Sequence, residues 1–333
     1  MVSIIILTYN QLNLTIQCFD SIKKSTDIDY EVIVVDNKST DGTKEYLKQH
    51  LPSIFKKYRL ILNEKNNGFA KGVNQGILSA KGDYICLLNN DTEVKDGWIT
   101  QLIQTLEQYP KAGIVGPVSS GTFEPQYVET PEDITDNIFE TNIMYGFCVV
   151  FRRELLHKIG MLDERYRIGN FEDHDFNERI IKNGGKIIVD GRTYIEHYCH
   201  SSWKSKFHLD YATVRNMNVF YEKWGFHKEI KQKIGSYTYY SCQESAIYVL
   251  TGNQQEDLRV LKKIQQNSWN SEEYIIVDTI FDQIIEDRIN EMQREHRIVQ
   301  VKVPDREKLE FEQLKQCGIR NSFGKKYIVI GEE

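Results

Sequence analysis

Short runs of apolar and β-branched residues alternate with amphipathic segments through the first part of the chain. The apolar runs predict strands at Val2–Leu7, Glu31–Val35, Tyr58–Leu62 and Tyr84–Leu88. Between them, apolar residues recur at helical spacing, which predicts helices at Leu12–Lys24, Thr43–Gln49 and Gly72–Ala80. This alternation indicates an α/β fold in which helices cover both faces of a parallel sheet.

Polar residues follow each of these strands. They are Thr8-Tyr9-Asn10, Asp36-Asn37-Lys38-Ser39, Asn66-Asn67-Gly68-Phe69 and Asn89-Asn90-Asp91. Residues of these types form turns and helix caps in any strand-to-helix loop, so each loop alone has an ordinary structural explanation. The carboxyl ends of parallel strands share one edge of the sheet, however, and ligands bind at that edge. Polar loops after all of these strands therefore favour a site for a polar ligand.

Two acids among these residues suggest what the ligand is. Asp36 directly follows a buried strand, where a carboxylate accepts hydrogen bonds from a base or a ribose. Asp91 follows the apolar run Ile85–Leu88 and is placed to bind a hard divalent cation that also contacts phosphate oxygens. The chain has neither G-x-x-x-x-G-K-[ST] nor a G-x-G-x-x-G after its first strand, which disfavours P-loop enzymes and nicotinamide or flavin dehydrogenases. The pattern predicts a nucleotide held by an acid and a metal.

Composition narrows the class of protein further. Of the 333 residues, 40% are hydrophobic and 27% are charged, which is typical of a folded protein, and the formal net charge of −6 argues against a nucleic-acid partner. Six scattered cysteines without a C-x-x-C pair suit free thiols in the cytoplasm. The longest apolar runs fall far short of the ~20 residues of a membrane span. No basic region precedes the first strand, so we expect no signal peptide and a cytoplasmic location, with peripheral membrane association left open.

The ordered motifs from Ser3 to about Trp224 resemble glycosyltransferase family 2, of the GT-A fold type, and within it the bacterial rhamnosyltransferase-like branch. The opening Val2–Asn10 is similar to the family's first strand and nucleotide loop, and Glu31–Asn37 to its second. Asn89-Asn90-Asp91 lies where the family carries its D-x-D metal motif, with Asn89 in place of the first aspartate. The resemblance implies that the donor nucleotide is bound by Thr8, Tyr9, Asn10, Asp36, Asn37, Ser39, Asn66, Gly68, Phe69, Lys71, Asn74 and Asn90.

Motifs in the following part of the chain resemble the family's acceptor and catalytic segments. Gly146–Arg153 is similar to the stretch that lines the acceptor cleft, and Gly169–Phe176 is similar to the E-D-x-D element. The resemblance implies that Asp173 is the catalytic base and that Glu172 positions the acceptor or the base. It also places Gly146, Phe147 and Asp175 at the acceptor cleft. The alternative is that Glu172 and Asp173 are acids at a helix N-terminus that interact with the helix dipole.

A histidine completes the metal site that the resemblance implies. In Tyr194–His200, His197 matches the family's histidine near the metal and diphosphate better than His200 does. The expected cofactor is Mn²⁺ or Mg²⁺, bound by Asp91 and His197. A histidine with an ordinary structural hydrogen bond is the alternative.

The end of the chain repeats the α/β pattern. Ile247–Gln254 is similar to Ile4–Gln11, and Glu273–Asp278 is similar to Glu31–Asp36. We therefore predict a GT-A-type mixed sheet in residues 1–235, followed in 245–333 by a smaller α/β segment that is a degenerate partial repeat. An unrelated α/β appendage is the alternative, because buried parallel strands resemble one another. The copy ends where its own metal loop would begin, which suggests a longer protein.

Together these motifs predict an inverting, metal-dependent glycosyltransferase. The expected donor is a UDP-, dTDP- or GDP-linked sugar, and the expected acceptor is a hydroxyl of a glycan, a lipid-linked glycan or a glycoprotein in bacterial surface polysaccharide or glycoprotein glycan synthesis. A sugar-phosphate nucleotidyltransferase is disfavoured because Thr8–Leu14 lacks the Gly-, Arg- and Lys-bearing phosphate loop of those enzymes. A non-catalytic nucleotide-sugar-binding scaffold remains the other alternative.

Overall fold

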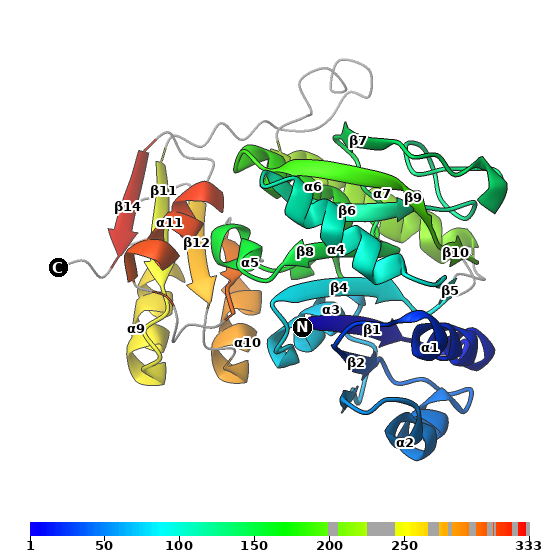
Figure 1. Ribbon diagram of the computed structural model, residues 1–333. Helices are drawn as coiled ribbons and strands as arrows, with labels where there is room; N and C mark the ends of the chain where they lie inside the picture. Colours follow the sequence, from blue (N-terminus) through cyan, green and yellow to red (C-terminus); the bar gives the residue numbers. More distant parts are fainter. Residues whose placement is uncertain are drawn as a thin grey trace. The chain divides into compact units, whose positions relative to one another are not determined.

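The chain folds into two compact units, which Figure 1 shows in a computed structural model. The structure describes residues 1–198, 206–224, 244–265, 273–278, 282–292, 298–304, 309, 311–321 and 326–330. The first unit contains Met1–Arg153 and Glu164–Met217, and the second contains Glu154–Asp163 and Asn218–Glu333. Most of the stretch between 235 and 245 lies outside the described residues, so the domain division made from the sequence stays a prediction.

An eight-stranded mixed sheet forms the centre of the first unit, in the order β3-β2-β1-β4-β8-β6-β9-β7 (Figure 1). Its strands are β1 (Val2–Thr8), β2 (Tyr30–Asp36), β3 (Tyr58–Leu62), β4 (Tyr84–Asn89), β6 (Ala112–Val118), β7 (Ile138–Thr141), β8 (Cys148–Arg152) and β9 (Lys186–Tyr194). The strands β1 to β4 pair in parallel, whereas β8 runs antiparallel to β4 and β6. The strands expected from the apolar runs and the mixed sheet are both confirmed.

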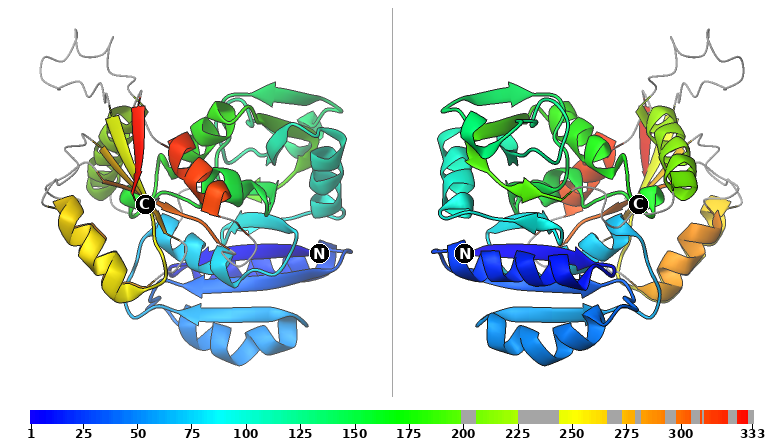
Figure 2. Two further views of the ribbon diagram at one scale, coloured as in Figure 1. Left: turned by 90° about the vertical axis from the view of Figure 1, so that its left-hand side faces the viewer. Right: turned by 90° about the vertical axis from the view of Figure 1, so that its right-hand side faces the viewer.

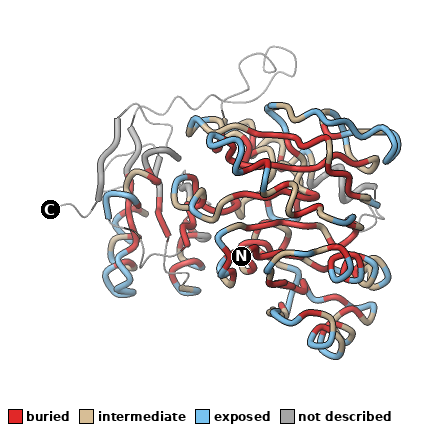
Figure 3. The backbone as a smooth tube through the Cα atoms, viewed as in Figure 1, coloured by how far each residue is buried: buried red, intermediate tan, exposed pale blue. Residues whose placement is uncertain are grey.

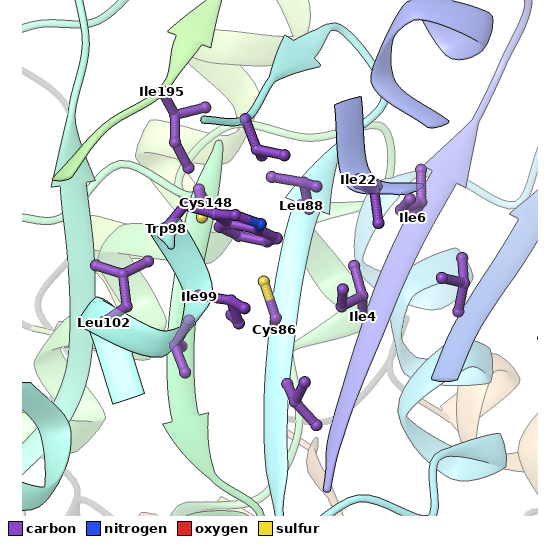
Figure 4. Close-up of a cluster of buried hydrophobic side chains, with 14 of the residues drawn as sticks. Ile4, Ile6, Ile22, Cys86, Leu88, Trp98, Ile99, Leu102, Cys148 and Ile195 are labelled. Atoms are coloured by element: carbon purple, nitrogen blue, oxygen red, sulfur yellow. The ribbon is translucent and has the colours of Figure 1, made fainter. Parts of the chain in front are cut away.

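Helices flank this sheet on both faces. They are α1 (Leu12–Ser25), α2 (Thr43–Ile54), α3 (Phe69–Ser79), α4 (Trp98–Gln108), α6 (Glu172–Lys182) and α7 (Lys206–Trp224), with short 3₁₀ turns at Pro131–Asp133 and Glu164–Tyr166. Even-numbered residues of β1, such as Ile4, join a buried core with Ile22 of α1 and Trp98 of α4 (Figure 4). Odd-numbered residues face α3, where a methyl group on Gly76 would lie 2.4 Å from Ile5 Cγ2. α1 and α3 thus lie on opposite faces of the sheet, which Figure 2 shows in two side views.

Two very short strands, one after β4 and one after β9, pair with each other. β5 (Thr92–Glu93) directly follows Asp91, and β10 (Glu196–His197) follows β9 after one residue, Ile195. They pair antiparallel, with His197 opposite Thr92. This pairing brings together two positions that are far apart in the sequence, Asp91 and His197.

The second unit contains a four-stranded parallel sheet in the order β13-β12-β11-β14. Its elements are β11 (Glu244–Val249), α9 (Gln254–Gln265), β12 (Glu273–Asp278), α10 (Gln283–Met292), β13 (Ile298–Lys302), α11 (Phe311–Asn321), β14 (Lys326–Ile330) and the short helix α5 (Leu155–Ile159). Buried residues line the inner strands of the first sheet, such as β1, β2 and β4, and continue in β12 of the second (Figure 3).

The strand order and register of the second sheet repeat those of β1 to β4. Ser3 pairs with Glu31 and Ile85, and Ser245 pairs with Glu273 and Tyr327. Ile247 therefore corresponds to Ile5, one residue away from the match to Ile4 that the letters suggest. Gly318 of α11 accordingly packs on Ile247 and Val277, as Gly76 packs on Ile5 and Val35. These features support the repeat, which stays a prediction.

The loop after β11 is closed by a side chain of the second unit itself. The Asp257 carboxylate, on α9, is fully buried. Its Oδ1 accepts hydrogen bonds from the Thr251 amide (2.9 Å), the Thr251 hydroxyl (3.0 Å) and the Tyr248 hydroxyl (2.6 Å). Its Oδ2 accepts a longer hydrogen bond from the Gly252 amide (3.3 Å). A carboxylate of the protein itself thus accepts the hydrogen bonds of two backbone amides at the carboxyl end of β11.

Candidate active site

Asp91 and His197 form a pair at the carboxyl end of β4. The distance between His197 Nε2 and Asp91 Oδ1 is 3.3 Å, and their side chains are only 11% and 9% exposed. The other ring nitrogen of His197, Nδ1, lies 2.6 Å from the carbonyl oxygen of Gly121. Because a carbonyl only accepts, this contact places a proton on Nδ1, and Nε2 is the nitrogen that faces Asp91.

The pair has the chemistry and the spacing of two ligands of one divalent cation. Carboxylate oxygen and imidazole nitrogen both bind Mn²⁺, and two neighbouring ligands of an octahedral ion lie about 3 Å apart. Among the described residues, no three His, Cys, Asp or Glu side chains lie close enough together to hold a metal ion.

Phe147 and Gly146 connect this pair to the predicted catalytic acids. The Phe147 ring stacks on the His197 ring, with centroids 4.9 Å apart and planes 11° apart. The preceding residue, Gly146, donates its amide hydrogen to Asp173 Oδ2 over 3.3 Å. Two consecutive residues before β8 thus link His197 of β10, which contacts Asp91, to Asp173 of α6.

Asp173 is held as a carboxylate by the residue that follows it. Its Oδ1 lies 2.8 Å from both the amide nitrogen and Nδ1 of His174. Burial alone would raise the pKa of Asp173, but the His174 hydrogen bonds and charge outweigh burial and lower it. Burial likewise would lower the pKa of His174, and the Asp173 contact raises it instead.

Glu172 has the opposite environment. It is 8% exposed, and its Oε2 is buried without a hydrogen-bond partner among the described residues. Burial, and then the charge of Asp173, raise the pKa of Glu172 to about 8. The two acids therefore share a single negative charge near neutral pH, with the proton on Glu172 and the charge on Asp173.

A strained turn places these acids at the start of α6. The backbone φ angles of Gly169, Asn170 and Phe171 are 134°, 72° and 71°. Residues other than glycine rarely adopt a positive φ. Asn216 of α7, which is 1% exposed, donates to the carbonyls of Tyr166 (2.6 Å), Gly169 (2.6 Å) and Asn170 (3.0 Å). The two hydrogens on Nδ2 are shared among these three carbonyl oxygens, and the contacts hold the turn in this conformation.

The predicted nucleotide loops after β1 and β2 are tied to each other. Asp36 is fully buried, and its carboxylate accepts hydrogen bonds from the Thr8 hydroxyl (2.9 Å) and from the Ser39 hydroxyl (2.5 Å) and amide (3.0 Å). Asn10 accepts from the Thr40 amide at 2.8 Å. The Asp36 carboxylate thus holds the loops after β1 and β2 together. Tyr9, in the loop after β1, is 42% exposed.

The predicted amide side chains also connect neighbouring loops. Asn37 donates to the Gly68 carbonyl (3.0 Å), Asn74 to Glu164 (2.9 Å) and Asn90 to the Thr15 hydroxyl (3.0 Å). Asn66 accepts from the Gly68 amide, and the Phe69 amide donates to the Arg167 carbonyl. The predicted donor residues thus lie along one sheet edge, Asn66 exposed and Lys71 half-buried. Their roles toward a nucleotide stay predictions.

Asp175 lies behind the site. It is fully buried, and its carboxylate pairs with Arg179 Nε at 2.9 Å, one turn along α6, and accepts from the Tyr166 hydroxyl at 3.3 Å. Its burial argues against the expected contact with the acceptor. The described cysteines Cys18, Cys86 and Cys148 are buried free thiols, and Cys317 is buried as well. His200, the alternative metal ligand, lies outside the described residues.

Sequence reasoning missed several residues of this site. His174 stands inside the quoted E-D-x-D motif, and its adjacency to Asp173 is a signal that points to their interaction. Asn216 and Gly121 carry no such signal, because their contacts depend on tertiary packing. No helix among the described residues is long and apolar enough to cross a lipid bilayer.

Comparisons with known proteins find glycosyltransferases among the proteins that are similar to this chain. The model of the family described as Glycosyl transferase family 2 matches residues 3–160. An uncharacterized glycosyltransferase of Haemophilus influenzae is 27% identical over 190 residues, which cover 55% of this chain and 62% of the relative. An N-acetylglucosaminyl-diphospho-decaprenol L-rhamnosyltransferase of Mycobacterium tuberculosis is 24% identical, over 55% of this chain and 71% of the relative. The chain covers only 29% to 62% of the length of three such relatives.

Among solved structures, GalNAc-T7 with UDP, GalNAc and Mn²⁺ is similar in fold. The TM-score is 0.53 at 20% identity, and the match covers 70% of this chain and 53% of that chain. This likeness confirms the expected GT-A fold class.

Proposed function

We propose that this chain, whose residues 3–160 belong to glycosyl transferase family 2, transfers a sugar from a nucleoside diphosphate sugar to an acceptor hydroxyl. The observation that carries the proposal is the link from the Asp91–His197 pair through Phe147 and Gly146 to Asp173. A cation ligand set and a charged base lie together at the carboxyl edge of the sheet. Transfer with inversion needs both, because the diphosphate leaves from one face of the sugar while the acceptor attacks the other.

The donor side of this site is built from Asp91, His197 and the loops after β1, β2 and β3. Asp91 and His197 are the residues that would hold the cation, Mn²⁺ or Mg²⁺, which neutralises charge on the leaving diphosphate when bound. The hydrogen bonds among Thr8, Asp36 and Ser39 order the loops that would contact the nucleotide of a UDP-, dTDP- or GDP-sugar.

On the acceptor side, Asp173 removes the proton from the attacking hydroxyl. Its Oδ2 accepts a long hydrogen bond from Gly146 and has capacity for a second, from the acceptor. Glu172, with its raised pKa of about 8, stays protonated and so avoids a second negative charge beside Asp173. A hydroxyl of a glycan, a lipid-linked glycan or a glycoprotein is the proposed acceptor, in surface polysaccharide or glycoprotein glycan synthesis.

The metal role is tested with Asp91→Asn. Product detection across UDP-, dTDP- and GDP-sugars, with Mn²⁺ or Mg²⁺, gives the wild-type donor and its metal dependence. Asp91→Asn should abolish metal-stimulated donor hydrolysis and transfer, since it removes a charged ligand. Asp96→Asn, an exposed aspartate five positions later, is the matched control and should retain wild-type turnover. Full wild-type activity in EDTA would contradict the proposal.

The base is tested with Asp173→Asn. Turnover should fall about 10²–10⁴-fold, the usual contribution of a general base. Donor affinity should change little, because Asp173 acts on the acceptor. If Asp173→Asn keeps the wild-type kcat and Glu172→Gln loses it, the two roles are reversed. The anomeric configuration of the product, read by NMR, tests inversion.

The same assays distinguish the alternatives. A nucleotidyltransferase would release pyrophosphate from a nucleoside triphosphate and a sugar 1-phosphate. A scaffold would bind the donor without turnover.

A further inference from the structure

Aromatic rings extend from the proposed base to the protein surface. His174, which contacts Asp173, has the Phe171 ring 5.2 Å away and the Tyr145 ring 5.8 Å away on centroids. The Tyr145 ring lies 5.6 Å from the ring of Phe123, which is 57% exposed. We call Phe123, Tyr145, His174 and Phe171 the aromatic row. It begins beside Asp173 and ends in solvent.

The row is built rigidly. Gln126, which is fully buried, donates to the Pro117 carbonyl at 2.9 Å and accepts from the Tyr145 amide at 2.7 Å. It thereby joins the loop that carries Phe123 to the segment that carries Tyr145. At the other end, Phe171 has a left-handed backbone in the turn that Asn216 holds. Rings fixed in this way lose little entropy when a ligand binds.

The row presents one exposed ring, Phe123, and half-buried rings that lead to a polar catalytic group. This combination favours a ligand with one apolar and several polar faces. The negative face of an aromatic ring attracts the weakly positive C–H groups on one face of a pyranose. The Tyr145 hydroxyl and the His174 ring of the row, together with Asp173 beside it, provide partners for the sugar hydroxyls.

The charge around the row argues for an uncharged ring. Asp173 and Glu178 both interact electrostatically with His174, and Glu172 precedes Asp173. A phosphate group placed here would be repelled by the carboxylates of Asp173 and Glu178, and an alkyl chain would leave the polar groups of the row without partners.

We propose that the aromatic row is a binding subsite for an uncharged hexopyranose ring of the acceptor. This proposal rests on the proposed glycosyl transfer, because it is the approach of the acceptor hydroxyl to Asp173 that brings the sugar ring to the row. Phe123 and Tyr145 form its stacking surface, and His174 and Asp173 its polar end.

The test compares Phe123→Ala with Tyr127→Ala. Tyr127 lies on the same loop and is 43% exposed, but it is outside the row, so its variant is the matched control. Saturation-transfer NMR with methyl glycosides of glucose, galactose, N-acetylglucosamine and rhamnose measures sugar binding to the full chain. The ratio of transfer to donor hydrolysis, with the best of these glycosides as acceptor, measures its use.

We expect Phe123→Ala to weaken glycoside binding and to lower the transfer-to-hydrolysis ratio about tenfold, equivalent to about 1.4 kcal/mol. Tyr127→Ala should behave as wild type. The subsite is overturned if Phe123→Ala binds the glycosides as wild type does, if no glycoside binds the wild type at 50 mM (roughly the weakest affinity expected for one stacked sugar), or if decyl phosphate binds the row in their place. Donor hydrolysis by the wild type without acceptor reports on the proposed function separately, so the two failures are distinguishable.

Discussion

Replacing Glu172 with glutamine should stabilise the protein, and more so as the pH rises. Glutamine has the shape of the protonated acid but cannot ionise. In the unfolded chain Glu172 loses its proton near its ordinary pKa of 4.5, whereas burial and the Asp173 charge raise the pKa to about 8 in the folded state. A folded-state pKa above the unfolded value means that the contribution of Glu172 to stability is fully present below pH 4.5. That contribution is then lost progressively as the pH rises to about 8.

The size of the effect follows from the same shift. Each pH unit between the two pKa values corresponds to about 1.4 kcal/mol, so the wild type gives up as much as about 3 kcal/mol by pH 7. Glu172→Gln avoids this loss, because the side chain is buried and its Oε2 has no hydrogen-bond partner among the described residues. The free energy of unfolding of the variant should therefore exceed that of the wild type by an amount that grows from pH 5 to pH 8.

Urea unfolding at pH 5, 6, 7 and 8, followed by tryptophan fluorescence, measures this difference, since Trp98 is buried in the core of the first unit. Glu45→Gln is the control, because Glu45 is an exposed acid in the first turn of α2 and its variant should show no such trend. A stability difference between Glu172→Gln and wild type that is the same at every pH would refute the reasoning.

Two further predictions concern the nucleotide. Asp36→Ala should weaken binding of a nucleoside diphosphate by about 1.5–3 kcal/mol, the range for a hydrogen bond to a charged group. The reason is that it removes the acceptor that orders Thr8 and Ser39. Calorimetry measures this affinity, and an unchanged value would count against the prediction. The second unit should bind no nucleotide and perform no chemistry, so a crystal soaked with the donor should show nucleotide density only on the first unit; density near Thr251 or Asp278 would show otherwise.

Most of the first sheet could be predicted from the sequence, because its central strands are continuous apolar runs. Val2–Thr8 and Tyr84–Asn89 are buried on both faces, and a continuous apolar run in the sequence indicates such burial. The adjacency of Asp91 and His197 has a different origin. It depends on the pairing of β5 with β10, each of two residues, which is too short to produce any periodicity. The resemblance to a known family, and not the pattern, indicated that pair.

The parts of the site that could not be predicted are those created by packing. Asn216 contacts three carbonyls of a turn about fifty positions earlier, and no local signal in the sequence marks such a residue. Asp36 was expected to face a ligand because it follows a strand, yet the hydroxyls of Thr8 and Ser39 lie on its carboxylate. The letters also matched Ile247 to Ile4 rather than Ile5, since neighbouring isoleucines in β1 are alike and only the register separates them.

Asp257 gives the second unit an intramolecular competitor for any anion. A group tethered within the same small fold acts at an effective concentration of millimolar or more, and here it is already aligned on the Thr251 and Gly252 amides. A phosphate from solution would have to displace that carboxylate and leave it buried without its partners. The loop after β11 thus has an internal carboxylate on the amides that an external anion would use. Asp257→Gly would remove that carboxylate and make the two amides available to an anion from solution.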